Sequence, residues 1–197
     1  MRKAFVLLVW MSLVLFACMS NLTMPEQANE GTVLTSESTP LSTAALPVQE
    51  LSLEALKNAE YHLGIETFRL VDGIHYLTPL PGESRNDWHI KIDQPIAFGD
   101  VNGDGANDAA VTLKSRSGGT GVWRCIAVVV NHGGQPLNIA TQCLGDRDRI
   151  TAIRITDDGV IIADVVIHGP GDAACCPSIE TTWRYRLVGT ELLKSEQ

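Results

Sequence analysis

A β-hairpin pattern is the strongest fold signal in this sequence and occupies residues 122–144, which read VWRCIAVVVNHGGQPLNIATQCL. Its first part, 122–130, is rich in the β-branched and aromatic residues that strands favour. Residues 131–135 are typical of a turn, because they include an asparagine and two glycines. We therefore predict that 136–144 returns antiparallel to 122–130.

The cysteines are consistent with this hairpin. A turn centred near residue 134 places Cys125 opposite Cys143, because both lie the same number of residues from that centre. Directly opposed strand residues have Cβ atoms about 4.5–5.5 Å apart, which is close to disulfide geometry. We predict a Cys125–Cys143 disulfide, which leaves Cys175 and Cys176 as an adjacent pair. Crossed pairings between these two sets are the alternative.

Strand patterns continue on both sides of the hairpin, and each is bounded by turn residues. They cover 66–71, 74–77, 109–113, 149–156, 160–168, 181–188 and 191–193. Asp72-Gly73 and Asp158-Gly159 are two-residue hairpin turns. Upstream, Ser52 can cap a short helix that includes Leu53, Leu56 and Lys57. We predict one mainly β domain over residues 49–197, an antiparallel curved sheet or sandwich with a short N-terminal helix.

An acidic loop precedes the strand at 109–113 and reads DVNGDGAND over residues 100–108. Calcium prefers six to eight oxygen ligands from carboxylates, amides, carbonyls and water. The loop supplies such oxygens at alternate positions, and its glycines permit a tight wrap. We expect Ca²⁺ as a structural cofactor, with ligands from Asp100, Asn102, Asp104, the Ala106 carbonyl and Asp108. The alternative is a turn closed by its own Asx hydrogen bonds.

The segment 96–111 also resembles a single FG-GAP repeat, the calcium-loop module of integrin-type β-propellers. The resemblance rests on Phe98-Gly99, the loop 100–108 and the apolar strand after it, and it implies the same five calcium ligands. Only one copy is present and no fixed-period repeat exists, so we do not expect a full propeller. Val111 stands where an EF-hand has its bidentate glutamate, so the loop is not an EF-hand.

A second unusual segment covers residues 168–177, HGPGDAACCP. One interpretation is a metal or redox site built from His168, Asp172, Cys175 and Cys176. The other is a loop fixed by a disulfide, which an oxidising compartment favours. The run from Ile161 to Tyr185 resembles small bacterial lipoproteins of unknown function and, more weakly, the LppP/LprE-type lipoproteins. This resemblance implies a cell-surface lipoprotein and no particular activity.

The amino terminus has the layout of a signal peptide. Arg2 and Lys3 precede an uncharged apolar run, 4–16, which is shorter than the roughly 20 residues that span a bilayer. The run ends in Leu15-Phe16-Ala17-Cys18, which resembles the lipobox of bacterial lipoproteins. We expect residues 1–17 to be removed and Cys18 to be lipidated, with ordinary secretion or a retained membrane anchor as alternatives.

We predict that residues 18–48, which begin with the lipidated cysteine, form a disordered tether. They are rich in Ser, Thr, Pro and Glu and show neither helical nor strand periodicity. The chain has a net charge of −8, and loss of Arg2 and Lys3 would make it more acidic. We therefore exclude nucleic acid as a partner. The expected location is the extracytoplasmic face of the cell membrane or outer membrane.

The functional expectation is a lipid-anchored, calcium-stabilised surface domain with a binding or envelope-interaction role. Its expected partners are the membrane, through the lipid, and an envelope protein or glycan. No Gly-x-Ser-x-Gly, His-Glu-x-x-His or phosphate-binding glycine loop is present, so we name no catalytic residue. The alternative is an extracytoplasmic enzyme or redox protein that uses His168, Asp172, Cys175 and Cys176.

Overall fold

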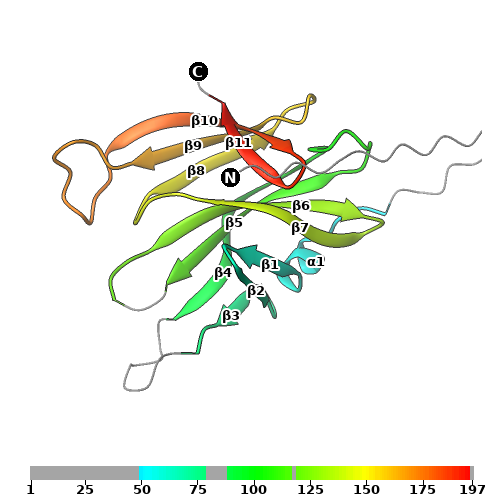
Figure 1. Ribbon diagram of the computed structural model, residues 1–197, viewed down its shortest axis with the longest axis horizontal. Coiled ribbons are helices and arrows are strands. Elements are labelled where there is room, and N and C mark those ends of the chain that lie inside the picture. The colour runs from blue at the N-terminus through cyan, green and yellow to red at the C-terminus, as the bar shows by residue number, and fades with distance from the viewer. Residues whose placement is uncertain (1–48, 79–87, 117–118, 196–197) are drawn as a thin grey trace, which may run out of the picture. The chain divides into compact units, whose positions relative to one another are not determined.

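A five-stranded antiparallel sheet forms the middle of the fold in the computed structural model (Figure 1), which describes residues 49–78, 88–116 and 119–195. Its strands are β3 (Ile74–Tyr76), β4 (His89–Gly99), β5 (Asp108–Arg116), β6 (Trp123–His132) and β7 (Gln135–Cys143). They lie in the order β3-β4-β5-β6-β7, and each pairs antiparallel with its neighbour.

The two central strands of this sheet are buried on both faces. Residues 109–113 of β5 and 125–129 of β6 are apolar almost without interruption, and all of them are buried. Thr112 is the one polar residue in these two runs. Its hydroxyl donates to the Pro95 carbonyl at 2.7 Å, beside a bulge in β4. Such continuous apolar runs are what a strand covered on both sides requires.

The predicted hairpin of β6 and β7 and its disulfide are confirmed, although the turn lies half a residue from the expected centre. Gly133 and Gly134 form the loop with φ of 61° and 84°, so His132 pairs with Gln135. That register alone would oppose Cys125 to residue 142. A bulge between Val128 and Val129 shifts the ladder by one residue, and Cys125 then pairs with Cys143, to which it is disulfide-bonded.

A second antiparallel sheet covers one face of the first. It comprises β8 (Arg149–Ile155), β9 (Ile161–Ile167), β10 (Ile179–Val188) and β11 (Glu191–Ser195), in the order β11-β10-β9-β8. β8 packs against β4, and β11 packs against β7. The core between the sheets includes Ala110, Ile126 and Val128 from the first sheet and Ile161, Val165 and Tyr185 from the second.

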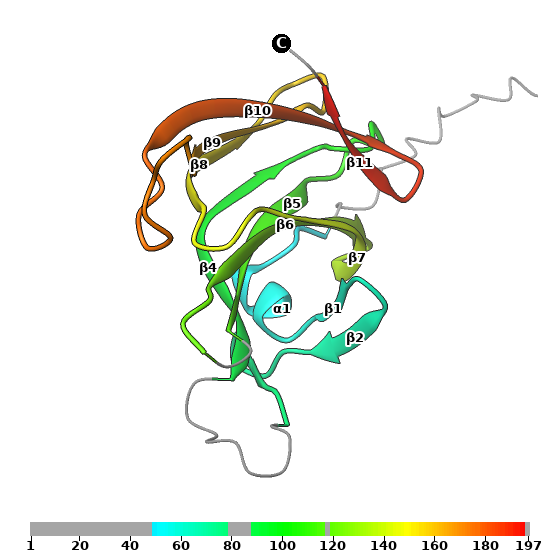
Figure 2. The same cartoon turned by 60° about the vertical axis from the view of Figure 1, so that its left-hand side comes forward.

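The other face of the five-stranded sheet curves around the N-terminal elements, which makes this part a half-barrel (Figure 2). Helix α1 (Leu53–Lys57) lies inside the curve, and the hairpin of β1 (Glu60–Leu63) and β2 (Glu66–Arg69) lies beside β7. The Ser52 side chain accepts from the Ala55 N–H, as its capping role predicts. Leu56 is fully buried in the enclosed core.

The expected fold class is confirmed, since the chain is mainly antiparallel β with curved sheets and one short helix, and it is neither a closed barrel nor a propeller. Two strands, β1 and β4, did not emerge from the sequence. The expected hairpin of 66–71 with 74–77 is reduced to one bridge, Val71 to Ile74, because β2 pairs with β1.

The described residues, 49–78, 88–116 and 119–195, belong to one compact unit. In the part that the structure describes, no helix is long and apolar enough to cross a membrane. The expected signal peptide 1–17, the lipidation site Cys18 and the tether 18–48 lie outside the described residues.

Candidate functional site

The acidic loop connects β4 to β5 and closes their hairpin. The ladder between these strands ends at the pair Gly99 and Asp108, so residues 100–107 connect the strands and Asp108, the last residue of the acidic loop, begins β5. Gly103 and Gly105 have φ of 80° and 85°, a backbone conformation in which glycine is not strained. This wrap brings Asp100, Asn102 and Asp104 together around the backbone N–H groups of the loop.

Asp100 organises the first half of the loop. Its Oδ1 accepts from the N–H groups of Gly103 at 2.6 Å and Asp104 at 3.2 Å, and its Oδ2 accepts from the Gly105 N–H at 2.8 Å. These donors stabilise the carboxylate, and the Gly105 N–H contributes most to lowering the pKa of Asp100 below its usual value.

Asn102 and Asp104 bond to each other at the exposed tip of the loop. Asn102 Nδ2 donates to Asp104 Oδ2 at 2.9 Å, while Asn102 Oδ1 accepts from the Asp104 N–H at 3.0 Å. Asp104 Oδ1 accepts from the Ala106 N–H at 2.8 Å. The Asx hydrogen bonds that the alternative interpretation requires are therefore present.

Asp108 is the fully buried carboxylate of the loop. Its two oxygens accept from the Val101 N–H and the Asn131 N–H, both at 2.9 Å. Burial raises the pKa of Asp108, these two hydrogen bonds oppose that rise, and the negative charge of Asp104 adds to it. The carboxylate thus ties both ends of the loop to the start of the β6–β7 turn.

Asn131 extends this connection to the beginning of the described chain, and sequence reasoning missed it. Its Oδ1 accepts from the Gly134 N–H at 2.7 Å, and its Nδ2 donates to the Gln49 carbonyl at 2.9 Å. The turn signal at Asn131 was visible in the sequence. Its contacts with Asp108 and Gln49 join segments far apart in the chain, so no local pattern reveals them.

The donor chemistry of the loop fits calcium, since all of its side-chain ligands are oxygens. Each carboxylate oxygen has two lone pairs, so a hydrogen bond to one leaves the other free to bind an ion. Within residues 49–78, 88–116 and 119–195, however, no three acidic, histidine or cysteine side chains form a group that could hold a metal. In the described conformation Asp108 bonds to Val101 and Asn131, apart from the Asn102–Asp104 contact at the loop tip.

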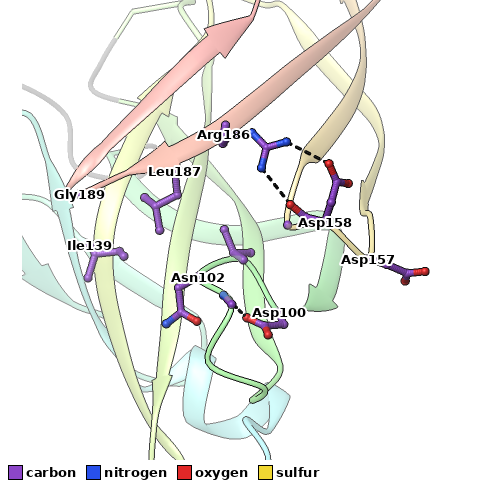
Figure 3. A pocket seen from close by; sticks show the side chains of 11 residues that line it. Asp100, Asn102, Ile139, Asp157, Asp158, Arg186, Leu187 and Gly189 are labelled. Atoms are coloured by element: carbon purple, nitrogen blue, oxygen red, sulfur yellow. Dashed lines mark hydrogen bonds and ion pairs between the residues drawn. The ribbon is translucent and has the colours of Figure 1, made fainter.

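A groove of about 490 Å³ lies against the acidic loop, where three loops of the two sheets meet (Figure 3). Part of its wall is the acidic loop, part is the turn between β8 and β9, and part is the end of β10. The lining side chains include Asp100, Asn102, Ile139, Asp157, Asp158, Arg186 and Leu187. The groove therefore combines carboxylates, an amide and a guanidinium with aliphatic side chains.

Two contacts fix the far wall of the groove. Gly159, with φ of 76°, packs so closely that an added Cβ would lie 2.9 Å from the Val101 carbonyl oxygen. Arg186 donates to the carboxylate of Asp158 and to its carbonyl, both at 3.0 Å. The charges of Asp100 and Asp157 are not offset in this way, so the groove carries net negative charge.

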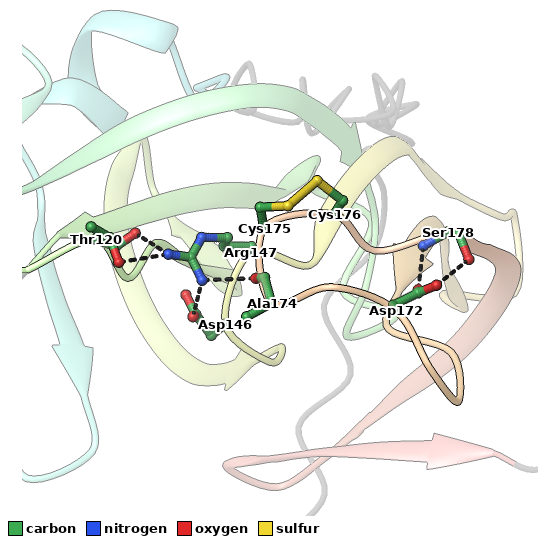
Figure 4. The surroundings of a disulfide bond; sticks show 8 residues. All are labelled: Thr120, Asp146, Arg147, Asp172, Ala174, Cys175, Cys176 and Ser178. Carbon is green, nitrogen blue, oxygen red and sulfur yellow. Dashed lines mark hydrogen bonds and ion pairs between the residues drawn. A yellow bond between two sulfur atoms is a disulfide. The ribbon is translucent and has the colours of Figure 1, made fainter.

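The second predicted segment forms an exposed loop at 168–178 (Figure 4). Asp172 fixes the base of the loop, because it accepts from the Gly169 N–H and from the N–H and hydroxyl of Ser178 at 2.8–2.9 Å. These donors, Gly169 foremost, lower the pKa of Asp172. Cys175 and Cys176, whose pairing the sequence left open, are bonded to each other, so this disulfide leaves no thiolate for a metal.

His168 contacts a residue outside the 168–178 loop. Its Nδ1 lies 3.2 Å from Oδ1 of the nearly buried Asp148, on the loop before β8. Its Nε2 is buried and has no hydrogen-bond partner among the residues that the structure describes. The structure therefore pairs His168 with Asp148, a residue that sequence reasoning did not select, while Asp172 is bound to Gly169 and Ser178.

Comparison of this chain with protein-family models, with curated proteins and with solved structures finds no match.

Proposed function

We propose that this protein is a lipid-anchored domain on the extracytoplasmic face that binds a glycan of the cell envelope in the groove beside the acidic loop. The observation that carries this proposal is the meeting of three loops around that groove, where polar and aliphatic side chains face one space. Its volume lies within the range of about 300–1,000 Å³ that is usual for ligand pockets.

Export and anchoring are supported by two features of the chain. The sequence before Cys18 has the signal-peptide layout and ends like a lipobox. The four remaining cysteines form two disulfides, which are typical of proteins outside the cytoplasm. A lipid on Cys18, followed by the polar residues 19–48, would place the β domain at a distance from the membrane surface.

Calcium is proposed as the structural cofactor of the acidic loop. Asp100, Asn102, Asp104, the Ala106 carbonyl and Asp108 would hold the ion, which would offset the repulsion among three carboxylates. Such a cation would also stabilise the buried charge of Asp108, whose pKa is raised by its burial and by Asp104. The loop would then form a rigid wall of the groove.

A glycan suits the chemistry of this groove better than a protein surface does. Asp100 and Asn102 offer acceptors for hydroxyl groups, and Arg186 offers donors. Ile139 and Leu187 supply a small apolar patch for the C–H face of a sugar ring. Protein interfaces typically rely on aromatic and arginine anchors, and of these the described groove lining contains Arg186 alone.

The test is co-sedimentation of the full-length protein with purified peptidoglycan sacculi. We expect the native chain to pellet with sacculi and Arg186→Ala to bind about tenfold more weakly, which corresponds to roughly 1.4 kcal/mol. Arg154→Ala is the matched control, because Arg154 forms an equivalent exposed pair with Asp164 at 3.0 Å on the same sheet but outside the groove.

Equal losses in the two variants, or no sedimentation of the native chain, would contradict the glycan proposal. Capture of an envelope protein that Arg186→Ala abolishes and Arg154→Ala preserves would replace the glycan with a protein as the ligand of the same groove.

A further inference from the structure

The two disulfides of this protein differ in what they connect. Cys125–Cys143 joins two strands 18 residues apart in sequence, and Cys125 is buried in the core. A bond of that kind restricts the unfolded chain and stabilises the fold. Cys175–Cys176 joins adjacent residues and closes no chain loop. Loop-closure entropy therefore gives it no stabilising role.

The surroundings of Cys175–Cys176 lead to the same conclusion. Both cysteines are exposed in the 168–178 loop. The base of that loop is fixed independently by Asp172, which bonds to Gly169 and Ser178. The backbone N–H of Cys176 bonds to the Ala173 carbonyl at 2.9 Å. Loss of the sulfur–sulfur bond would leave the loop attached at both ends, and exposed disulfides are the ones that exchange readily.

Arg147 places a permanent cation beside this disulfide. Its Nη1 donates to the Ala174 carbonyl at 2.8 Å, one residue before Cys175. Its Nη2 donates to the carbonyl and hydroxyl of Thr120 at 2.8 and 2.7 Å, and Asp146 pairs with Nη1. Figure 4 shows Cys175 on the side of the disulfide that faces Arg147. A neighbouring guanidinium stabilises a thiolate, and the ion pair with Asp146 offsets part of the Arg147 charge.

We propose that Cys175–Cys176 is a thiol–disulfide exchange site for a dithiol reductant of the Cys-x-x-Cys type, and that Arg147 is its positioning residue. This activity goes beyond the binding role proposed above and uses a different loop. The observations that carry it are the exposure of both cysteines, the absence of any cross-linking role and the cation bound at Ala174.

The exchange is balanced with a dithiol as the reductant. A thiolate of the dithiol attacks Sγ of Cys176, which forms a mixed disulfide and breaks the Cys175–Cys176 bond. The electron pair of the broken bond remains on Cys175 as a thiolate beside Arg147, and this thiolate takes a proton from water. The second thiol of the reductant then displaces Cys176, so that the reductant becomes a disulfide and Cys175 and Cys176 become a dithiol.

The test exposes the native full-length protein to reduced thioredoxin, alkylates free thiols at intervals and locates the modified cysteines by mass spectrometry. We expect Cys175 and Cys176 to be modified at least about tenfold faster than Cys125 and Cys143. Equal rates, or earlier reduction of Cys125–Cys143, would overturn the proposal. The internal comparison requires no variant that has to fold.

Variants of Arg147 test its assigned role. Arg147→Gln should slow the modification of Cys175 and Cys176 several-fold, and Arg147→Lys, which retains the charge, should restore most of the rate. Arg149→Gln is the control, because Arg149 is an exposed arginine two residues away. An unchanged or faster rate in Arg147→Gln, or the same slowing in Arg149→Gln, would remove Arg147 from the exchange site.

Discussion

At the scale of single residues, the acidic loop contains two carboxylates whose pKa values are shifted in opposite directions. Asp100 is stabilised in its charged form by backbone N–H groups, whereas Asp108 is buried and its charged form is disfavoured. Both belong to one loop of nine residues, yet the first organises the loop and the second attaches it to the β6–β7 turn. Separate experiments can therefore distinguish the two roles.

Asp108→Ala should lower the free energy of unfolding by about 2–6 kcal/mol. The substitution leaves the N–H groups of Val101 and Asn131 buried without an acceptor, and each such group costs roughly 1–3 kcal/mol. Urea unfolding measures this change. Asp157→Ala is the control, since Asp157 is an exposed groove residue, and its effect should stay within about 0.5 kcal/mol. A loss below about 1 kcal/mol in Asp108→Ala would contradict the role of Asp108.

Protonation of Asp100 in acid should make the fold less stable. The pKa of Asp100 is lowered from its ordinary 3.8 by folding, so its contribution is present above that value and is lost as the pH falls through the lowered pKa. Asp100→Asn cannot titrate and should show a flatter decline in stability below about pH 4. The measurement is urea unfolding across a pH series with chelator present.

The raised pKa of Asp108 changes the pH dependence of stability in the opposite direction. It is present in both the parent chain and Asp100→Asn, so it cancels when the two are compared. Asp157→Asn serves as the control for Asp100→Asn. Parallel pH curves for the parent chain and Asp100→Asn would show that the backbone donors of the loop do not stabilise the Asp100 carboxylate.

At the scale of secondary-structure elements, the turn residues determine much of which strands pair. Asp158-Gly159 was visible as a hairpin signal, and this turn formed where expected, between β8 and β9. The strand β4 was not visible, because Gln94-Pro95 interrupts a stretch of mixed polarity at 89–99. Its pairing with β5 and its packing on β8 are tertiary effects that a local pattern does not contain.

The two turn glycines form a matched pair for testing the packing of the groove wall. Both have positive φ, 76° at Gly159 and 61° at Gly189, so alanine should cost about 1–2 kcal/mol of backbone strain at either site. Only at Gly159 would the added Cβ also meet the backbone of the acidic loop. Gly159→Ala should therefore destabilise by at least about 1 kcal/mol more. Equal losses in thermal unfolding would contradict this packing.

At the scale of the whole molecule, the sequence indicated the class of fold but not which segments meet. The hairpin of 122–144 predicted its own disulfide, and Ser52 predicted α1, because those signals are local. The groove depends on Arg186, Asp158 and the acidic loop, which come together only after the two sheets pack. The same holds for Arg147, whose partners Thr120 and Ala174 lie 27 residues away on either side.

The proposed anchor is tested by Cys18→Ser. If the lipid on Cys18 attaches the protein to the membrane, the variant should move from the membrane fraction to the soluble extracytoplasmic fraction, because no acyl chain remains. Immunoblots of fractionated cells and metabolic labelling with a fatty acid provide the measurement. An equally labelled and equally membrane-bound variant would show that Cys18 is not the attachment site.

The central claim, a calcium-stabilised binding domain, is tested most directly by thermal unfolding of the full-length protein in millimolar calcium and then in chelator. A ligand that binds only the folded state stabilises it by about 2.7 kcal/mol at a hundredfold excess over its Kd. We predict that calcium raises the unfolding temperature of the native chain and leaves that of Asp104→Ala unchanged. In chelator, both chains should unfold at the same temperature. An unfolding temperature that calcium leaves unchanged would contradict the claim and identify residues 100–108 as a turn closed by its own hydrogen bonds.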